Sequence, residues 1–271
     1  MTDPTAPPPQ VLSAFGAGEP AVRLPGGQGQ TYRSGDLILK PAPHPSEIAW
    51  PASVHDQIPQ IGFRIARPLP ARNGAWIIHG WWAQQRLDGE PAPGRWAEVF
   101  DTARAFHTAT RRLARPAFLA ARTDRWAIAD RAAWQEAPLV SSLQSQAAPH
   151  AALSRLIALL RPIDLPSQLI HGDLAGNVLF ADPATPGVID LAPYWRPAAF
   201  ALAVVAVDAL VWGGARSDIL ALLDPDPQIP QLRVRAALRR ILEHGAQPEA
   251  AEVAAYADLI TLLEALCGRV A

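Results

Sequence analysis

The sequence predicts an α+β protein, with a small β-rich lobe at its N-terminal end and a larger helical lobe after it. Short β-prone runs separated by glycine-rich turns fill the first 80 residues. Most of the remainder carries apolar residues at the spacing of amphipathic helices. One β-prone hairpin, residues 177–190, interrupts these helices. With 271 residues, 49% of them hydrophobic, the chain is long enough to bury a substantial core.

Changes in composition mark the boundaries of the two lobes. Residues 1–10, MTDPTAPPPQ, predict a disordered tail, and they carry neither the basic nor the apolar region of a signal peptide. Residues 11–80 form the expected β-rich lobe. The stretch DGEPAPG lies in the expected linker, residues 81–94, and residues 95–271 form the expected helical lobe.

Two hairpins are expected in the β-rich lobe. In the first, β-prone runs flank Gly26, Gly27 and Gly29. In the second, the dipeptide Asn73-Gly74 stands between two further runs and is a strong signal for a two-residue turn. Turn residues therefore mark most of the expected strand boundaries in this lobe.

Lys40 ends the apolar run that follows a second turn, Ser34-Gly35-Asp36, and lies just before a predicted short helix. It is the only lysine among 24 basic residues, and the other 23 are arginines. A compact ammonium on a flexible stem suits a crowded cleft better than a planar guanidinium does. In the helix that follows, Ser46 can act as the cap, and Glu47 lies in the first turn.

The helical lobe is predicted from apolar periodicity. An apolar run at residues 198–215 is interrupted by Asp208 and is shorter than the roughly 20 residues of a membrane span, so we expect a core helix. Asp208 is expected to be a buried acid with a hydrogen-bond partner. The other predicted helices are residues 95–114, 148–162, 230–245 and 248–270. Gly245 is the expected C-cap of the helix at residues 230–245.

Composition excludes several classes of function. The formal charge is −1 and no basic run is long enough to neutralise a phosphate backbone, so the chain is not expected to bind a nucleic-acid polymer. The single Cys267 excludes an internal disulfide and a multi-cysteine metal site. With no membrane span and no signal peptide expected, we predict a cytoplasmic protein. The sequence does not fix its oligomeric state.

Oxygen-bearing side chains converge on the open end of the hairpin at residues 177–190. If the run from Asn177 to Phe180 pairs with the run from Val188 to Asp190, then Asn177 and Asp190 become cross-strand neighbours. Asp173 lies in the loop just before them. Such oxygen ligands suit a hard cation that keeps several waters, which points to Mg²⁺.

The stretch LIHGDLAGNVLF, followed by GVIDL, resembles the catalytic loop and metal-binding strand of the aminoglycoside phosphotransferase and choline kinase-like group of the protein-kinase-like superfamily. The layout of most of the chain is similar as well, from the glycine hairpin, lysine strand and glutamate helix to the helix that ends in RAFHTAT. The resemblance implies a bilobal protein-kinase-like fold. It also implies a phosphotransferase that uses ATP and Mg²⁺.

Carried onto the helical lobe and its hairpin, the resemblance assigns roles to four residues. It implies that Asp173 orients or deprotonates the acceptor hydroxyl, and that His171 braces the loop. Asn177 and Asp190 would hold Mg²⁺ on the phosphates of the nucleotide.

Carried onto the β-rich lobe, the resemblance implies a nucleotide site. Lys40 would reach the α- and β-phosphates, with Glu47 holding it by an ion pair. The backbone at Gly26, Gly27 and Gly29 would approach the phosphates.

Other interpretations remain open at this stage. Three residues separate Asp173 from Asn177, where the family usually has four, so a degenerate kinase-like protein that binds nucleotide for a regulatory or structural purpose is an alternative. A metal-dependent hydrolase using His171 and Asp173 is another. Lys40 also fits a solvated strand end, and Glu47 fits an acid that favours the positive start of its helix.

The acceptor is expected to be a small molecule with a hydroxyl group. The ten residues LAPYWRPAAF after Asp190 leave no room for the long activation loop of a protein kinase. Tyr194, Trp195 and Arg196 are predicted to shape an acceptor pocket. The last helices mix acids with Arg233, Arg235, Arg239 and Arg240, which is not the acidic face that a cationic aminoglycoside would need.

Overall fold

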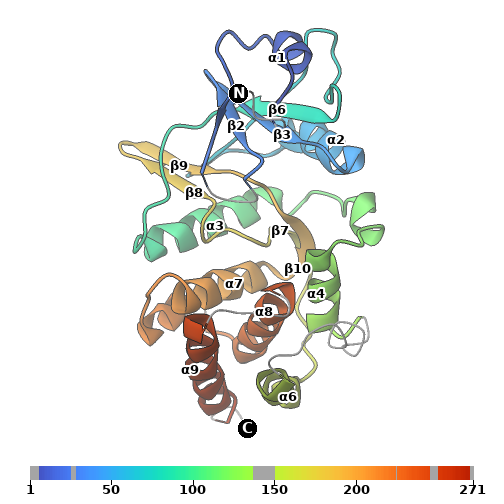
Figure 1. Ribbon diagram of the computed structural model, residues 1–271. Helices are drawn as coiled ribbons and strands as arrows, with labels where there is room; N and C mark the ends of the chain where they lie inside the picture. The colour runs from blue at the N-terminus through green and yellow to red at the C-terminus, as the bar shows by residue number, and fades with distance from the viewer. Residues whose placement is uncertain (1–5, 26–28, 137–149, 224, 245–249, 269–271) are drawn as a thin grey trace. The chain divides into compact units, whose positions relative to one another are not determined.

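The computed structural model describes residues 6–25, 29–136, 150–223, 225–244 and 250–268. The chain divides into two compact units, each considered by itself. Unit 1 comprises Met1–Pro91 with Val178–Asp190, and unit 2 comprises Ala92–Asn177 with Leu191–Ala271. Strands dominate unit 1 and helices dominate unit 2, so the predicted α+β class is confirmed (Figure 1).

The main sheet of unit 1 has five strands in the order β1-β2-β3-β6-β5. Every neighbouring pair is antiparallel, and β3 lies between β2 and β6, with Lys40 opposite Trp82. The first part of the predicted linker is therefore a sheet strand. The bounds are β1 Val22–Arg23, β2 Tyr32–Ser34, β3 Leu37–Pro41, β5 Pro68–Leu69 and β6 Trp81–Gln85.

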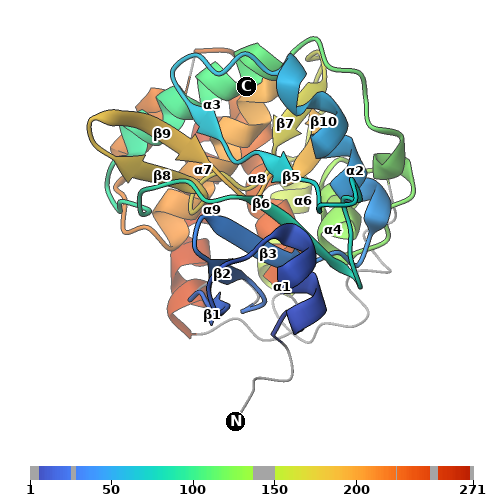
Figure 2. The ribbon, with the colours of Figure 1, turned by 90° about the horizontal axis from the view of Figure 1, so that it is seen from above.

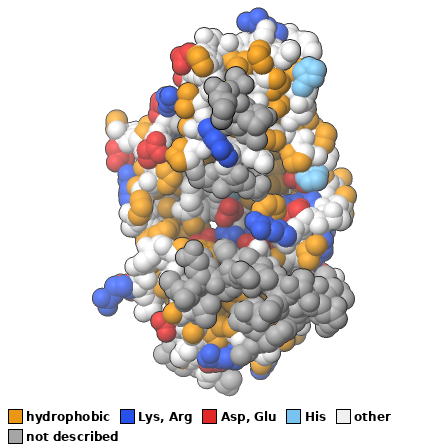
Figure 3. All heavy atoms as spheres, in the orientation of Figure 1, with side chains coloured by type: hydrophobic (Ala, Val, Ile, Leu, Met, Phe, Trp, Pro, Cys, Tyr) orange, Lys and Arg blue, Asp and Glu red, His pale blue; other side chains and the backbone are white. Residues whose placement is uncertain are grey.

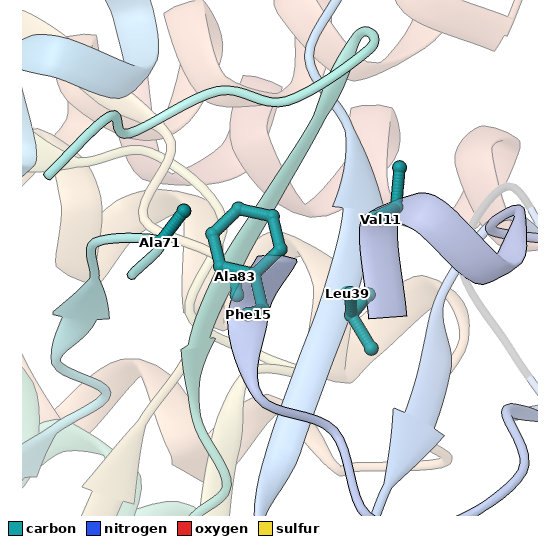
Figure 4. Close-up of a cluster of buried hydrophobic side chains, with 5 residues drawn as sticks. All are labelled: Val11, Phe15, Leu39, Ala71 and Ala83. Atoms are coloured by element: carbon teal, nitrogen blue, oxygen red, sulfur yellow. The ribbon is translucent and has the colours of Figure 1, made fainter. Parts of the chain in front are cut away.

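The helix α1, Pro9–Phe15, covers one side of this sheet (Figure 2). Its buried residues Val11 and Phe15 pack with Leu39, Ala71 and Ala83, as Figure 4 shows. The helix starts inside the predicted tail, so that prediction is wrong for residues 9 and 10. Proline at the first helical position fits because its fixed φ suits a helix and its missing N–H would have no partner there.

The helix α2, Pro45–Val54, follows β3 and carries Glu47 in its first turn, as predicted. The prediction that Ser46 caps it is wrong. The N-cap is His44, without a side-chain cap bond, and Pro45 opens the helix. A short 3₁₀ helix, His55–Gln57, continues the chain.

A second sheet of unit 1 joins segments that are far apart in sequence. Strand β4, Arg64–Ile65, runs parallel to β9, Ala184–Val188, which pairs antiparallel with β8, Val178–Ala181. Glu90 and Phe180 exchange backbone hydrogen bonds of 3.2 and 3.0 Å. At Gly89, where φ is 121°, a Cβ would lie 2.7 Å from the Phe180 carbonyl oxygen, so only glycine allows this approach.

The Asn73-Gly74 turn is present but does not join two strands directly. The Ala71 N–H donates to the Ala75 carbonyl at 2.8 Å, and the Asn73 side chain accepts from the Ala75 N–H at 3.0 Å. A second turn at Ile78–Trp81 follows before β6 begins. The connection is therefore longer than the predicted two-residue hairpin loop.

The helices of unit 2 bury their apolar faces against one another. Helix α7 is buried from Phe200 to Ala209, which confirms the predicted core helix, and α8 packs against α4, α6, α7 and α9. No helix in the described part of the chain is both long and apolar enough to cross a membrane. The bounds are α3 Trp96–Thr110, α4 Arg125–Ala133, α6 His150–Leu159, α7 Ala198–Val211, α8 Ile229–His244 and α9 Ala250–Cys267.

Unit 2 also contains a two-stranded antiparallel ladder that the sequence analysis did not predict. Strand β7, Gln168–His171, pairs with β10, Pro193–Arg196, with His171 opposite Pro193 and Ile170 opposite Tyr194. Leu169, Ile170 and His171 are fully buried. Two 3₁₀ helices, Ala117–Ala120 and Ser217–Leu222, complete the unit. The predicted C-cap Gly245 lies outside the described residues.

Candidate functional site

The loop from His171 to Asn177, here the HGD loop, starts where β7 leaves its ladder. The Gly172 N–H donates to the Ala192 carbonyl at 2.8 Å. A Cβ at Gly172 would lie 2.5 Å from the Tyr194 ring and 2.9 Å from Arg239 Nη1. The packing around this position therefore has room for glycine only.

His171 is hydrogen-bonded to the backbone of the HGD loop, and its predicted bracing role stays a prediction. It is fully buried, and its Nδ1 accepts the Asp173 N–H at 3.1 Å. The His171 N–H in turn donates to Nε2 of His107, on α3, at 3.2 Å. Burial, assisted by the neighbouring His171, lowers the pKa of His107 to about 3, so this imidazole stays a neutral acceptor.

The Asp173 carboxylate is fixed by an arginine from α8. Arg240 Nη2 lies 2.6 Å from Asp173 Oδ1, while 48% of the Asp173 side chain remains exposed. Burial raises the pKa of Asp173, but the adjacent Arg240 guanidinium outweighs this effect, so the pKa lies below its usual value. Asp173 is thus an ionised carboxylate that solvent and small molecules can reach.

Asn177 is anchored to Asp173 across the shortened loop. Its Nδ2 donates to the Asp173 carbonyl at 2.6 Å and lies 3.3 Å from Asp173 Oδ2. The Asn177 N–H closes a turn on Leu174, which is fully buried and fixes the loop to the core. Because the amide nitrogen makes these contacts, the amide oxygen is the atom left for a ligand.

In unit 1, Lys40 forms an ion pair with Asp190. The Lys40 side chain is 16% exposed and that of Asp190 is 40% exposed. Asp190 lies two residues beyond the end of β9 with a φ of 52°, a left-handed conformation that is uncommon outside glycine. Glu47 is half-buried in the first turn of α2, and its predicted ion pair with Lys40 stays a prediction.

The glycine hairpin is described only in part. Gly26 and Gly27 lie outside the described residues, whereas Gly29 has a φ of 66° and its carbonyl accepts from Arg23 Nε at 2.6 Å. The Leu24 N–H donates to the Thr31 carbonyl at 2.9 Å and closes the hairpin. The positive φ explains why glycine is needed at position 29.

The hairpin after the HGD loop differs from its prediction in its bounds. The second strand starts at Ala184, inside the predicted turn ADPATPG, and ends at Val188. The register pairs Val178 with Val188, so Asn177 and Asp190 are not register partners as predicted. A tight turn at Asp182-Pro183 needs fewer residues than the turn-rich sequence suggested.

The charges of α8 also require a correction. Arg233, Arg235, Arg239 and Arg240 are all less than 10% exposed, so they are not part of an acceptor-facing surface mixture as predicted. Buried carboxylates pair with Arg239 and Arg240, whereas Arg233 donates to the Leu220 carbonyl and Arg235 to Gln231 and the Arg161 carbonyl. On the face shown in Figure 3, the charged side chains that do reach the surface are of both signs.

Tyr194, Trp195 and Arg196 line a hollow of unit 2, together with residues of α4. Arg196 Nη2 donates to Asp130 at 2.7 Å and to Glu136 at 2.8 Å, so its guanidinium is committed within the fold. That the hollow takes the acceptor stays a prediction.

Sequence reasoning missed two of the residues that hold the HGD loop. His107 is not among the predicted site residues, although its place after Phe106 in the RAFHTAT stretch was a usable signal. Arg240 gave no signal, because it lies 67 residues from Asp173 on a helix with several arginines. Only the packing of α8 reveals which arginine reaches the carboxylate.

In unit 1, the Asp190 carboxylate is 40% exposed and is an oxygen ligand of the kind that Mg²⁺ accepts while keeping several waters. In unit 2, the amide oxygen of Asn177 is a ligand of the same kind. That Asn177 and Asp190 hold Mg²⁺ stays a prediction. No group of three or more His, Cys, Asp or Glu residues with metal-binding geometry occurs among the described residues. The hydrolase alternative is disfavoured on other grounds, because His171 is fully buried and its Nδ1 is occupied by a backbone N–H.

Comparison with solved structures shows the fold. An aminoglycoside phosphotransferase from Alicyclobacillus acidocaldarius is similar with a TM-score of 0.63 at 16% identity, covering 100% of this chain and 98% of the other. The choline kinase LicA from Streptococcus pneumoniae has a TM-score of 0.61 at 11% identity, covering 93% and 96%. Amicoumacin kinase in complex with AMP-PNP, Ca²⁺ and Ami has a TM-score of 0.59 at 13% identity, covering 90% and 88%.

Comparison with curated protein sequences finds no match. The model of the phosphotransferase enzyme family matches residues 21–194, which is more than half of the chain and includes Lys40, the HGD loop and Asp190. The predicted resemblance is confirmed, and the chain belongs to the phosphotransferase enzyme family.

Proposed function

We propose that the protein is an ATP- and Mg²⁺-dependent phosphotransferase that acts on a hydroxyl group of a small molecule. Family membership supports a small-molecule phosphotransferase in general. The observation that carries the finer proposal is the HGD loop, where a half-exposed, ionised Asp173 is held beside an Asn177 whose amide oxygen is free.

Asp173 is the residue that receives the acceptor. Its Oδ1 is bound to Arg240, and its Oδ2, which lies 3.3 Å from Asn177 Nδ2, has a further lone pair that can accept a hydrogen bond from a hydroxyl group. A carboxylate in this state orients the hydroxyl for attack and takes up its proton as the new bond to phosphorus forms. The buried imidazoles of His107 and His171 hold the backbone that carries it.

Lys40 and Asp190 serve the nucleotide. Lys40 binds phosphate oxygens, and its ion pair with Asp190 supports this role because both side chains retain solvent exposure and a single salt bridge of this kind is easily exchanged. Asn177 and Asp190 would hold Mg²⁺, which when bound neutralises charge on the phosphates. Gly29 lets the backbone of the hairpin approach the same phosphates.

The test is a thermal-shift titration with Mg·ATP on the wild type and on Lys40→Ala and Asp190→Ala. A ligand that binds only the folded state raises the melting temperature, so we expect stabilisation in the wild type that is lost in both variants. Asp56→Ala is the matched control, since Asp56 is another exposed carboxylate of unit 1 and pairs with Arg67 and with His55. It should keep the full shift.

ATP consumption followed in the same samples separates the proposal from the regulatory alternative. Turnover that disappears in Asp173→Asn supports phosphotransfer. Stabilisation by Mg·ATP without turnover, across a panel of small hydroxyl compounds, favours a nucleotide-binding protein that transfers nothing. The absence of stabilisation under all metal conditions would contradict the nucleotide site.

A further inference from the structure

Arg240 lies at the centre of a charge cluster in unit 2, here the α8 cluster, made of Arg240, Asp173, Asp208, Glu243 and Arg239. The Arg240 side chain is 8% exposed, while Asp208 and Glu243 are 7% and 4% exposed. Helix α8 supplies Arg239, Arg240 and Glu243, α7 supplies Asp208, and the HGD loop supplies Asp173. The cluster therefore ties the HGD loop to two core helices.

The whole guanidinium of Arg240 is engaged. Its Nε donates to Asp208 Oδ1 at 2.7 Å and its Nη2 to Asp208 Oδ2 at 2.5 Å, which is a bidentate contact. Its Nη1 donates to Glu243 Oε2 at 2.7 Å. A planar fork held at both ends cannot rotate, so the remaining Nη2 contact to Asp173 has a fixed direction.

Glu243 is itself held from the other side. Its Oε1 accepts from Arg239 Nε at 2.6 Å, and Arg239 lies over the Tyr194 ring at 4.2 Å from the centroid. The supports of Arg240 are thus as buried and as fixed as Arg240 itself. Asp173 is the exception in the cluster, because about half of its side chain is exposed.

The difference in exposure between Asp173 and the rest of the α8 cluster indicates whether the Arg240–Asp173 contact stabilises α8 or positions Asp173. Asp208 and Glu243 already balance Arg240 within the core, so stability of α8 does not require a third, half-exposed carboxylate. For Asp173 the same contact removes rotational freedom from the group that would receive the acceptor. Fixing a reacting group before the substrate arrives lowers the entropic cost of the reaction.

We propose that Arg240 is a positioning residue for Asp173, with Asp208 and Glu243 as its supports. The inference rests on the proposed function for its catalytic part. Its structural part, a direct energetic link between Arg240 and Asp173, does not depend on that function.

The test compares Arg240→Lys with Arg235→Lys. Lysine keeps the positive charge but has no fork with which to join Asp208 and Asp173. Arg235 is the matched control, because it is equally buried on α8 and donates to Gln231 and to the Arg161 carbonyl. We expect kcat to fall at least about 10-fold in Arg240→Lys with the KM for ATP changed less than about 3-fold. Arg235→Lys should keep kcat within about 3-fold at a similar loss of melting temperature.

A second measurement needs no activity. The melting temperatures of Asp173→Asn, Arg240→Lys and the double variant form a cycle that reports whether the two residues interact. We expect the combined loss to be smaller than the sum of the single losses, whereas the cycle of Asp173→Asn with Arg235→Lys should be additive.

The outcomes separate the two proposals. An additive Arg240 cycle overturns the positioning role, and so does an unchanged kcat in an active Arg240→Lys enzyme. If the wild type shows no turnover that depends on Asp173, the proposed function fails, and the cycle alone then supports or overturns the link between Arg240 and Asp173.

Discussion

Asp190 and Asp173 are both exposed carboxylates of the proposed active site, but their ion-pair partners are held differently. Asp190 forms an ion pair with Lys40 and lies two residues beyond the end of β9, the central strand of the three-stranded sheet of unit 1. Asp173 is bound to an arginine that two further buried carboxylates hold in place. Asp190, which is expected to exchange Lys40 for a metal ion, is therefore in an exposed ion pair. Asp173, which is expected to bind the acceptor, is bound to an arginine that is itself fixed in the core.

The largest effect is expected at Arg240. Replacing it in Arg240→Met leaves Asp208 and Glu243 buried without their shared cation, which should cost about 3–5 kcal/mol of unfolding free energy. Urea denaturation of the variant and the wild type measures this loss. The control is Arg155→Met, which breaks the exposed pair with Glu264 and should cost much less unfolding free energy. Equal losses in the two variants would show that the α8 cluster is no firmer than a surface pair.

The pH dependence of stability sharpens the comparison. Burial raises the pKa of Asp208 to about 6, although Arg240 opposes the rise. A carboxyl whose pKa is higher in the folded state stabilises the fold when protonated, and this contribution is lost as pH rises from about 4 to about 6.

Asn at position 208 cannot titrate, so Asp208→Asn should gain stability relative to the wild type as pH rises from 4 to 7, by up to about 3 kcal/mol. Urea denaturation at each pH unit measures the difference. For Asp173→Asn the lowered pKa predicts the opposite sign, with the change confined to pH values below about 4. If the difference in unfolding free energy between Asp208→Asn and the wild type did not change with pH, the raised pKa of Asp208 would be contradicted.

A smaller effect is expected from Gly172→Ala in the HGD loop. The added Cβ would meet the Tyr194 ring at 2.5 Å, and overpacking of this kind costs about 1–3 kcal/mol. Gly176→Ala is the control on the same loop, since a Cβ there has no neighbour within 4 Å. Thermal denaturation should separate the two variants, and similar melting temperatures would mean that β7 and β10 can move apart at no cost.

The smallest effect on stability is expected at Lys40. Because Asp190 is 40% exposed, Lys40→Met should change the unfolding free energy by no more than about 1 kcal/mol. The same variant should nevertheless lose stabilisation by Mg·ATP. A large loss of stability without nucleotide would show that the Lys40–Asp190 pair is a structural element.

The sequence predicted the elements whose signals are local. The core helix α7 follows from its apolar run, and Glu47 in the first turn of α2 follows from the start of that helix. The HGD loop was identified because its residues are contiguous and match a family pattern.

What the sequence did not predict depends on long-range packing. The partners of Asp173 and of His171 lie on α8 and α3, and no local spacing distinguishes Arg240 from Arg239 or Arg235. Turn-rich composition misplaced the start of β9, because proline and glycine in Ala184–Val188 argued against a strand that the parallel partner β4 supports.

The pairing of β4 with β9 also bears on how the nascent chain matures on the ribosome. Arg64 pairs with Gly187, which follows it by 123 residues, and Arg64 Nε donates to the Thr185 carbonyl at 2.8 Å. At about 5–20 residues per second, synthesis of that interval takes on the order of 10 seconds. During this time β4 has no partner strand, so the three-stranded sheet of unit 1 can form only after β9 has been synthesised.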